Sequence, residues 1–158
     1  MLGWLYRCAD TFRHRARMRT WDPDLAQGRR GEDVAHRYLT RLGYHVVARN
    51  YRTPGGWAEA DLVAWDGPTL VFVEVKSRQT EEFGSPDRAI DPTKRRKIAA
   101  AARDYVRRAG LEQTPLRFDV VSIVWSAAEP VTHLPGAFLP PQPGVMGSRS
   151  PLSNRAGA

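Results

Sequence analysis

The stretch Thr69-Leu-Val-Phe-Val-Glu-Val-Lys-Ser-Arg78 is the most strand-like segment of the chain, because β-branched and aromatic residues dominate it. A second run of similar character, Trp57-Ala-Glu-Ala-Asp-Leu-Val-Ala-Trp65, precedes it. Asp66-Gly67, a turn-forming pair, lies between the two runs. Together they predict a β-hairpin over residues 57–78.

The register of this hairpin decides which charged side chains lie together. A turn centred on Asp66-Gly67 pairs Asp61 with Phe72 and Glu59 with Glu74. Residues directly opposite each other point to the same side of a sheet. A shift of one residue would send the two sets to different faces, so the prediction depends on this register.

In that register four charged side chains gather on one side of the hairpin, together with Val63: Glu59, Asp61, Glu74 and Lys76. Opposed like charges destabilise a strand pair by about 0.2–1 kcal/mol, and burial raises the cost. A lysine neutralises one carboxylate, and Mg²⁺ or Mn²⁺ would compensate the others. Such a group has the components for metal-assisted phosphodiester hydrolysis. The alternative interpretation is an edge-strand surface on which Glu74 and Lys76 form a solvated pair.

The rest of the chain predicts two helices and further strands. Asp22-Pro23-Asp24 begins the first helix and Gly43 ends it, while Asp91-Pro92 begins the second and Gly110 ends it. Further strands are predicted over residues 45–51, 116–125 and 131–133. This order predicts an α/β fold with one mixed sheet of four or five strands flanked by helices.

Length and composition indicate a single small globular domain with an anionic partner. The 158 residues are 42% hydrophobic and 26% charged, which excludes a collagen-like, wholly disordered or integral membrane protein. There are 24 Lys and Arg against 17 Asp and Glu, a net charge of +7. A basic domain of this size favours nucleic acid as a partner, the alternative being charge for solubility alone.

The ends of the chain differ in composition from its centre. We expect a basic extension over residues 1–21, an ordered domain over 22–139 and a disordered Pro/Gly/Ser-rich tail over 140–158. Residues 1–20 have two interpretations. They form a short basic amphipathic helix that contacts a membrane surface or a partner, or they have no ordered structure. Met18 is an alternative start of the chain.

Few features suggest export, membrane insertion or a zinc site. Cys8 is the single cysteine, so an internal disulfide and paired-cysteine zinc sites are excluded, and the four histidines are scattered. The apolar start, residues 1–6, is too short for a signal-peptide core or for the roughly 20 residues that span a bilayer. We therefore expect a cytoplasmic protein without membrane insertion.

The start of the second helix carries a run of cations: Lys94, Arg95, Arg96 and Lys97. Cations here oppose the helix dipole, whereas the positive start of a helix is a good phosphate site. With Arg78, this run predicts a nucleic-acid-binding surface; the alternative is a solvated basic face. Tyr51 and Trp57 offer rings for base stacking, although an aromatic residue in a strand is more often part of the core.

Several motifs occur in a fixed order over roughly residues 25–138: Gly28-Arg-Arg-Gly31-Glu32, Gly43-Tyr44, Arg49-Asn50-Tyr51-Arg52, Glu59-Ala60-Asp61-Leu62-Val63, Phe72-Val-Glu-Val-Lys-Ser-Arg78, Phe83-Gly-Ser-Pro86 and Arg117-Phe-Asp-Val-Val121. In this the chain resembles the YraN-type uncharacterised bacterial proteins. That family is placed in the restriction-endonuclease-like, or PD-(D/E)xK, superfamily, together with archaeal Holliday-junction resolvases.

The resemblance implies a restriction-endonuclease-like fold and a site for Mg²⁺ or Mn²⁺. Asp61 and Glu74 match its metal ligands, and Glu32 matches the acidic residue of the first helix that completes the site. Lys76 matches the catalytic lysine, and Glu59 matches a further acidic position that we assign to catalysis. In the Arg117-Phe-Asp119 motif we interpret the acid as structural, paired with the arginine or with a helix residue.

Two functions from different classes follow. The first is a Mg²⁺-dependent nuclease that hydrolyses phosphodiester bonds in branched or structured nucleic acid, with DNA favoured over RNA. The second is a non-catalytic nucleic-acid-binding protein that retains the nuclease fold. Junction-cutting members of the superfamily act as dimers, so the resemblance also implies that the protein can form a homodimer.

Overall fold

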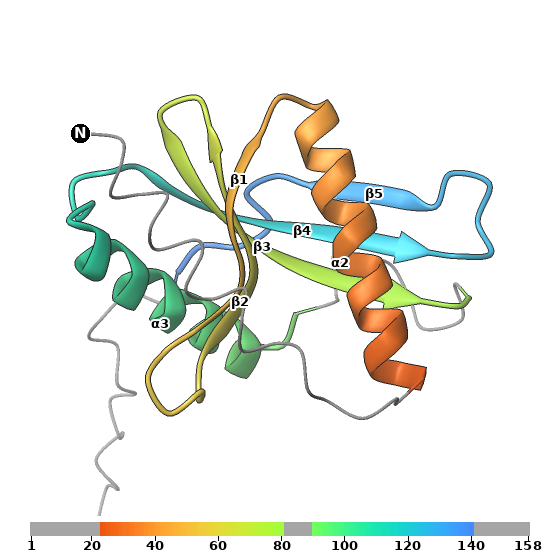
Figure 1. The fold of residues 1–158 in the computed structure, drawn as a ribbon, viewed down its shortest axis with the longest axis horizontal. Coiled ribbons are helices and arrows are strands. Elements are labelled where there is room, and N and C mark those ends of the chain that lie inside the picture. Colours follow the sequence, from red (N-terminus) through yellow and green to blue (C-terminus); the bar gives the residue numbers. More distant parts are fainter. Residues whose placement is uncertain (1–22, 81–89, 141–158) are drawn as a thin grey trace, which may run out of the picture.

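The computed structural model describes residues 23–80 and 90–140 (Figure 1). The predicted extension over 1–21 and, except for Pro140, the predicted tail over 140–158 lie outside the described residues. The described elements, in chain order, are α2 (Pro23–Arg41), β1 (His45–Arg52), β2 (Glu59–Asp66), β3 (Thr69–Arg78), α3 (Pro92–Ala109), β4 (Leu116–Val124) and β5 (Val131–Leu134).

One five-stranded sheet runs through the molecule in the order β1-β2-β3-β4-β5. Strands β3 and β4 are parallel, with α3 in the connection between them, and every other neighbouring pair is antiparallel. The structure is therefore the predicted α/β fold with a mixed sheet and is consistent with a restriction-endonuclease-like fold. The predicted strands and helices are confirmed, with ends that agree within two residues.

The helices cover opposite faces of the sheet and divide the core into two layers (Figure 1). The α2 layer contains Ala35, Leu39, Leu62, Val71, Val73, Val121 and Ile123. The α3 layer includes Val63, Leu70, Phe72, Phe118, Val120 and the buried residues of α3 from Ile98 to Val106. Because alternate residues of β3 and β4 enter different layers, both central strands read as continuous apolar runs.

Local sequence explains where α3 begins and ends. The side chain of Asp91 accepts hydrogen bonds from the backbone N–H groups of Thr93 (2.7 Å) and Lys94 (2.9 Å), as an N-cap residue does. Pro92 occupies the first turn, where its missing N–H costs nothing. Gly110 ends the helix in the left-handed conformation, with φ 66°.

The predicted register of the β2–β3 hairpin is wrong by two residues. Asp66 pairs with Thr69, so the loop is Gly67-Pro68 rather than Asp66-Gly67. The predicted register would have placed Pro68 in the ladder, where it has no N–H to donate. Phe72 consequently pairs with Val63 and not with Asp61.

The shift by an even number of positions preserves the faces of the strands. The predicted register places Glu59 opposite Glu74. In the structure the ladder between β2 and β3 ends at Leu62 and Val73, so Asp61 is the residue of β2 next to Glu74. The hairpin therefore brings the two proposed metal ligands of β2 and β3 closer together than the sequence predicted.

Strand β2 also departs from strict alternation close to Asp61. Ala60 and Val63 pack in the same core layer, which regular alternation would forbid, so the prediction that Glu59, Asp61 and Val63 share one face is wrong. Beside this point Asn50 of β1 has φ 51°, a left-handed conformation that asparagine tolerates better than most residues. The irregularity marks the place where Asp61 leaves the regular pleat.

A buried polar cluster joins β4 and β5. Asp119, whose exposure is 0%, accepts hydrogen bonds from Nε of Arg117 (2.9 Å) and the backbone N–H of Gly136 (2.9 Å), and lies 2.9 Å from Nε2 of His133. This confirms the predicted pairing of Asp119 with Arg117. The arginine also donates to Asp66 at the β2–β3 turn (2.7 Å), so the cluster ties two hairpins together.

Neither helix within residues 23–80 and 90–140 is long and apolar enough to cross a bilayer.

Candidate functional site

A polar hollow of about 410 Å³ lies between α2 and the diverging ends of β2 and β3. Its lining comprises Gln27, Gly28, Glu32, Asp61, Glu74, Val75, Lys76 and Ser77. Four residues that the sequence singled out for metal binding and catalysis therefore face one space, although they come from three different elements.

Asp61 is held in place by the backbone of the neighbouring strand. Its Oδ2 atom accepts a hydrogen bond of 2.7 Å from the backbone N–H of Val75. Burial and the nearby carboxylate of Glu74 raise the pKa of Asp61, and they outweigh the opposing effects of that hydrogen bond and of Lys94. Asp61 is therefore fixed by β3, while its charged form is disfavoured chiefly by burial.

Glu74 is the most buried carboxylate of the site, with an exposure of 2%. Its Oε1 atom lies 3.0 Å from Nζ of Lys76, two residues further along the same face of β3. Its Oε2 atom forms an ion pair with Nζ of Lys94 at 3.1 Å. This buried carboxylate therefore lies between two ammonium groups.

A second lysine enters the site from the first turn of α3. Nζ of Lys94 lies 3.4 Å from Oε1 of Glu59 as well as 3.1 Å from Glu74. Glu59 also pairs with Arg52 of β1 at 3.1 Å. The predicted catalytic residue Glu59 thus binds two cations at the rim of the site, where its side chain is 37% exposed.

Glu32 approaches the hollow from α2 and is already engaged. Its Oε2 atom accepts a hydrogen bond of 2.6 Å from Nδ2 of Asn50 and lies 3.7 Å from Arg49. Close packing of Gly31 against Ser77 brings this part of α2 to the end of β3. Because this contact holds α2 against β3, Glu32 faces the same hollow as Asp61 and Glu74.

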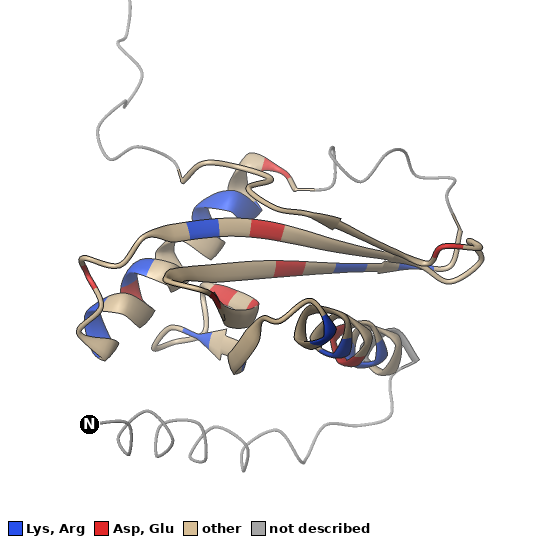
Figure 2. Cartoon of the chain, turned by 90° about the horizontal axis from the view of Figure 1, so that it is seen from above, with Lys and Arg blue, Asp and Glu red and all other residues tan. Residues whose placement is uncertain are grey.

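The remaining predicted nucleic-acid contacts differ in their surroundings. Arg96 and Lys97 are exposed on α3, whereas Nε of Arg95 donates to the carbonyl oxygen of Ile90 (3.0 Å). Arg78 is half-buried at the end of β3. Figure 2 shows basic and acidic positions interspersed along the strands and helices of the described fold.

The two candidate stacking residues, Tyr51 and Trp57, differ in their exposure to solvent. Tyr51 is buried, and its hydroxyl donates to Asp104 of α3 (2.7 Å), so it belongs to the core and is not open to a base. Trp57 is 61% exposed, in the loop between β1 and β2. Hydrogen bonds close this loop, because both the backbone N–H and the hydroxyl of Thr53 bond to the backbone of Ala58.

Sequence reasoning missed two features of the site. Asn50 belongs to the Arg49–Arg52 motif, but the sequence does not predict its bond to Glu32. The sequence predicts a phosphate contact for Lys94, whereas the structure places it against the carboxylates of the hairpin. The available signal for Lys94 was its position in the first turn of a helix, where a cation is unfavourable without an acidic neighbour.

The donor set fits a magnesium ion held by few protein ligands. Within the described ranges no group of three or more Asp, Glu, His and Cys side chains is arranged to hold a metal. Mg²⁺ commonly uses one or two carboxylates and completes its shell with water and substrate phosphates. Asp61 and Glu74, two carboxylates that line the same hollow, match that pattern.

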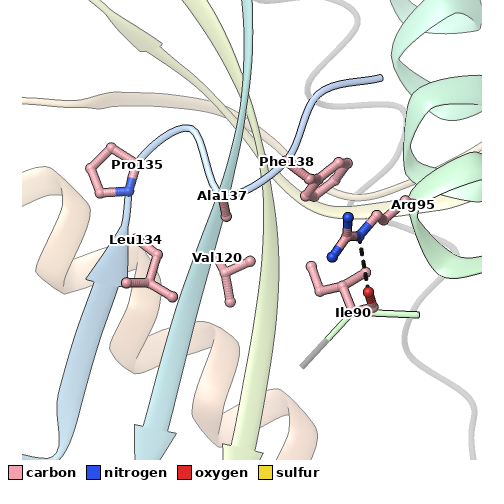
Figure 3. A pocket seen from close by; sticks show the side chains of 7 residues that line it. All are labelled: Ile90, Arg95, Val120, Leu134, Pro135, Ala137 and Phe138. Atoms are coloured by element: carbon pink, nitrogen blue, oxygen red, sulfur yellow. Dashed lines mark hydrogen bonds between the residues drawn. The ribbon is translucent and has the colours of Figure 1, made fainter. Parts of the chain in front are cut away.

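A second cavity, of about 250 Å³, lies on the α3 side of the sheet (Figure 3). It is lined by Ile90, Arg95, Val120, Leu134, Pro135, Ala137 and Phe138. The lining is mostly apolar and contains no carboxylate, so this cavity lacks the groups for metal-assisted hydrolysis, and the polar hollow remains the candidate site.

Comparison with known proteins finds related sequences across most of the described domain. The model of an uncharacterised protein family, UPF0102, matches residues 31–123. A UPF0102 protein of Solibacter usitatus is 50% identical over 138 residues, which cover 87% of this chain and 100% of the relative. UPF0102 proteins of Koribacter versatilis and Geobacter sulfurreducens are 43% and 47% identical, covering 73% and 70% of this chain and 80% and 87% of their own lengths.

Proposed function

The chain belongs to the UPF0102 family, whose function is uncharacterised, and from this premise we propose that it is a metal-dependent nuclease that hydrolyses phosphodiester bonds in structured DNA. The observation that carries the proposal is a pair of carboxylates, Asp61 and Glu74, that line one hollow beside a lysine. Asp61 is half-buried, Glu74 is almost fully buried, and one oxygen of Glu74 contacts Lys76 at 3.0 Å.

Asp61 and Glu74 are the proposed ligands of Mg²⁺ or Mn²⁺. When bound, the ion would polarise the phosphoryl oxygen and lower the pKa of a coordinated water. Asp61 is fixed for this role by Val75, and Glu74 by its surroundings at the end of β3. Two carboxylates leave coordination positions for water and substrate phosphate, as an open catalytic site needs.

Lys76 is the proposed catalytic lysine. Its ammonium lies on the same side as the metal-binding oxygens, and its side chain is 29% exposed, so it reaches both the carboxylate and the hollow. From there it can orient an attacking water and stabilise negative charge on the phosphate in the transition state. Glu32 completes the acidic lining, and its bond to Asn50 sets its direction.

Cations and a ring near the hollow are the proposed contacts to nucleic acid. Arg96 and Lys97 are exposed in the turn of α3 that follows Lys94, and Arg78 lies at the end of β3. Trp57 lies two residues before Glu59, which itself touches Lys94. An exposed indole on a rigid loop would stack on an unpaired base, which favours branched or single-stranded regions over uniform duplex. We favour DNA over RNA on the resemblance of the motifs to those of junction resolvases.

The direct test is cleavage of a labelled panel of duplex, single-stranded, flap and four-way DNA and of RNA, with Mg²⁺ or Mn²⁺. Wild-type protein is expected to cleave at least one branched or single-stranded DNA, and Asp61→Asn, Glu74→Gln and Lys76→Met are each expected to abolish that cleavage. Glu112→Gln, an acidic residue after α3, is the matched control and should retain it. Binding without cleavage of any substrate would favour the non-catalytic nucleic-acid-binding protein.

A further inference from the structure

Lys94 occupies an unusual place for a phosphate-binding side chain. It projects from the first turn of α3 into the carboxylates of the hairpin, and its side chain is only 20% exposed. The first turn of α3 contains no acidic residue, so the helix itself offers no favourable partner for this cation. The favourable charges come instead from β2 and β3.

The distances place the ammonium between two carboxylates. Nζ lies 3.1 Å from Glu74 and 3.4 Å from Glu59. The ammonium of Lys94 therefore forms ion pairs with the carboxylates at the proposed metal site.

With Lys94 in this position the carboxylates are largely balanced by protein cations. Glu59 pairs with Arg52 and Lys94, and Glu74 lies between Lys94 and Lys76. A divalent cation arriving alone would place its charge beside these ammonium groups, which costs free energy in a partly buried site. A substrate phosphate, by contrast, would give Lys94 a new anionic partner.

We propose that Lys94 couples the binding of metal to the binding of phosphate. In the free protein its ammonium compensates Glu74 and Glu59, and it turns from the carboxylates to a substrate phosphate as the divalent cation takes its place. This inference rests on the proposed function, because it assumes that Asp61 and Glu74 hold the ion. Lys94 is accordingly a substrate-binding residue that makes the site selective for metal and nucleic acid together.

Coupling of this kind is reciprocal. If DNA raises the affinity for metal by some factor, metal raises the affinity for DNA by the same factor. Typical coupling between two ligands is about 5–150-fold. Removing the Lys94 charge removes the competing cation, so metal should bind the isolated variant more tightly and should gain less from DNA.

The experiment is calorimetric titration of Mn²⁺ into the full chain, alone and with a four-way DNA junction made non-cleavable by phosphorothioate linkages. For wild type we expect the junction to increase the Mn²⁺ affinity by about tenfold or more. Lys94→Met should bind Mn²⁺ more tightly than wild type without DNA, and the junction should then change its affinity by less than about threefold. Arg103→Met, which removes an exposed cation of α3 that has no assigned role, should behave as wild type.

A conservative variant keeps the result interpretable if Lys94→Met fails to fold. Lys94→Arg retains the charge and is expected to fold and to preserve the coupling. Equal Mn²⁺ affinity with and without the junction in wild type would overturn the inference while leaving the nuclease proposal in place, as would undiminished coupling in Lys94→Met. No Mn²⁺ binding by wild type even with the junction would overturn the proposed function itself.

Discussion

Gly31 of α2 lies so close to Ser77 of β3 that a Cβ atom at residue 31 would be 2.8 Å from the Cβ atom of Ser77. The contact brings α2 to the end of β3, next to Lys76, and it places Glu32 over the hollow. The glycine is required here by space and not by a special backbone conformation, because residue 31 lies within a regular helix.

We predict that Gly31→Ala lowers the free energy of unfolding by about 1–3 kcal/mol, the usual cost of overpacking, despite the better helix propensity of alanine. The helix must move away from β3, so cleavage should also fall. Urea denaturation and the cleavage assay measure the two effects. Gly28→Ala is the matched control, since a Cβ there meets nothing within 4 Å, and it should stabilise the protein by about 0.5–1 kcal/mol. Equal stability of the two variants would contradict this account.

Asp119 gives a prediction about stability and pH. Burial alone would raise the pKa of Asp119, but the bonds from His133, Arg117 and the Gly136 N–H outweigh it and hold the pKa below its usual value. The folded state therefore binds this proton less readily than the unfolded state. Its contribution to stability is complete above the unfolded pKa of about 3.9 and is lost as the pH falls through the lower folded value.

Asp119→Ala should lower the free energy of unfolding near pH 7 by about 3–5 kcal/mol, because it leaves Arg117 without its buried partner. The difference between wild type and variant should shrink as the pH drops below about 4. Urea unfolding at several pH values measures it. Asp33→Ala, which breaks an exposed pair with Arg49, is the control and should cost less than about 1 kcal/mol. A pH-independent difference would refute the assignment.

Trp57 is predicted to contact unpaired bases. Replacing it by alanine should weaken binding to single-stranded or branched DNA by about 1–3 kcal/mol and leave folding stability nearly unchanged, because the indole is exposed. Fluorescence anisotropy of a labelled oligonucleotide measures the affinity. Leu42→Ala removes another exposed apolar side chain, at the end of α2, and should have no effect on binding. Equal losses in both variants would argue against stacking at Trp57.

The exposed cations of α3 are predicted to contact phosphates. Arg96→Ala and Lys97→Ala should each weaken DNA binding regardless of sequence and reduce the slope of log affinity against log salt by about 1. Arg41→Ala, in the last turn of α2, is the control for loss of one surface charge and should leave the slope unchanged. Slopes come from anisotropy titrations at several salt concentrations, and an unchanged slope in both α3 variants would contradict the proposed surface.

Much of the fold was predictable because local signals agree with the tertiary structure. Asp91-Pro92 and Gly110 mark both ends of α3, and the apolar run of β3 indicated a central strand. The hairpin register was not predictable from Asp66-Gly67 alone, because that pair is a good turn signal whereas the true loop is decided by Pro68.

Strand alternation does not account for the place of Asp61, because β2 departs from it beside this residue. The grouping of Glu74 with Lys76 was accessible from alternation, and the even error in the register did not disturb it. The entry of Lys94 into the same group was not, since it depends on how α3 lies against the sheet. The same holds for the bond between Asn50 and Glu32, which needs a left-handed residue in β1 facing a helix. Long-range packing determines both contacts, and single-sequence patterns carry little information about it.

The proposed nuclease activity requires that Asp61 and Glu74 bind a divalent metal ion, and this binding can be measured directly. Mg²⁺ would be titrated calorimetrically into wild type and into the double variant Asp61→Asn/Glu74→Gln, each mixed with a non-cleavable four-way DNA junction. After the heat of Mg²⁺ binding to the junction alone is subtracted, we expect saturable binding by wild type and none by the double variant, with the junction bound in both. Absence of Mg²⁺ binding by wild type, or equal binding by the two proteins, would contradict the proposal.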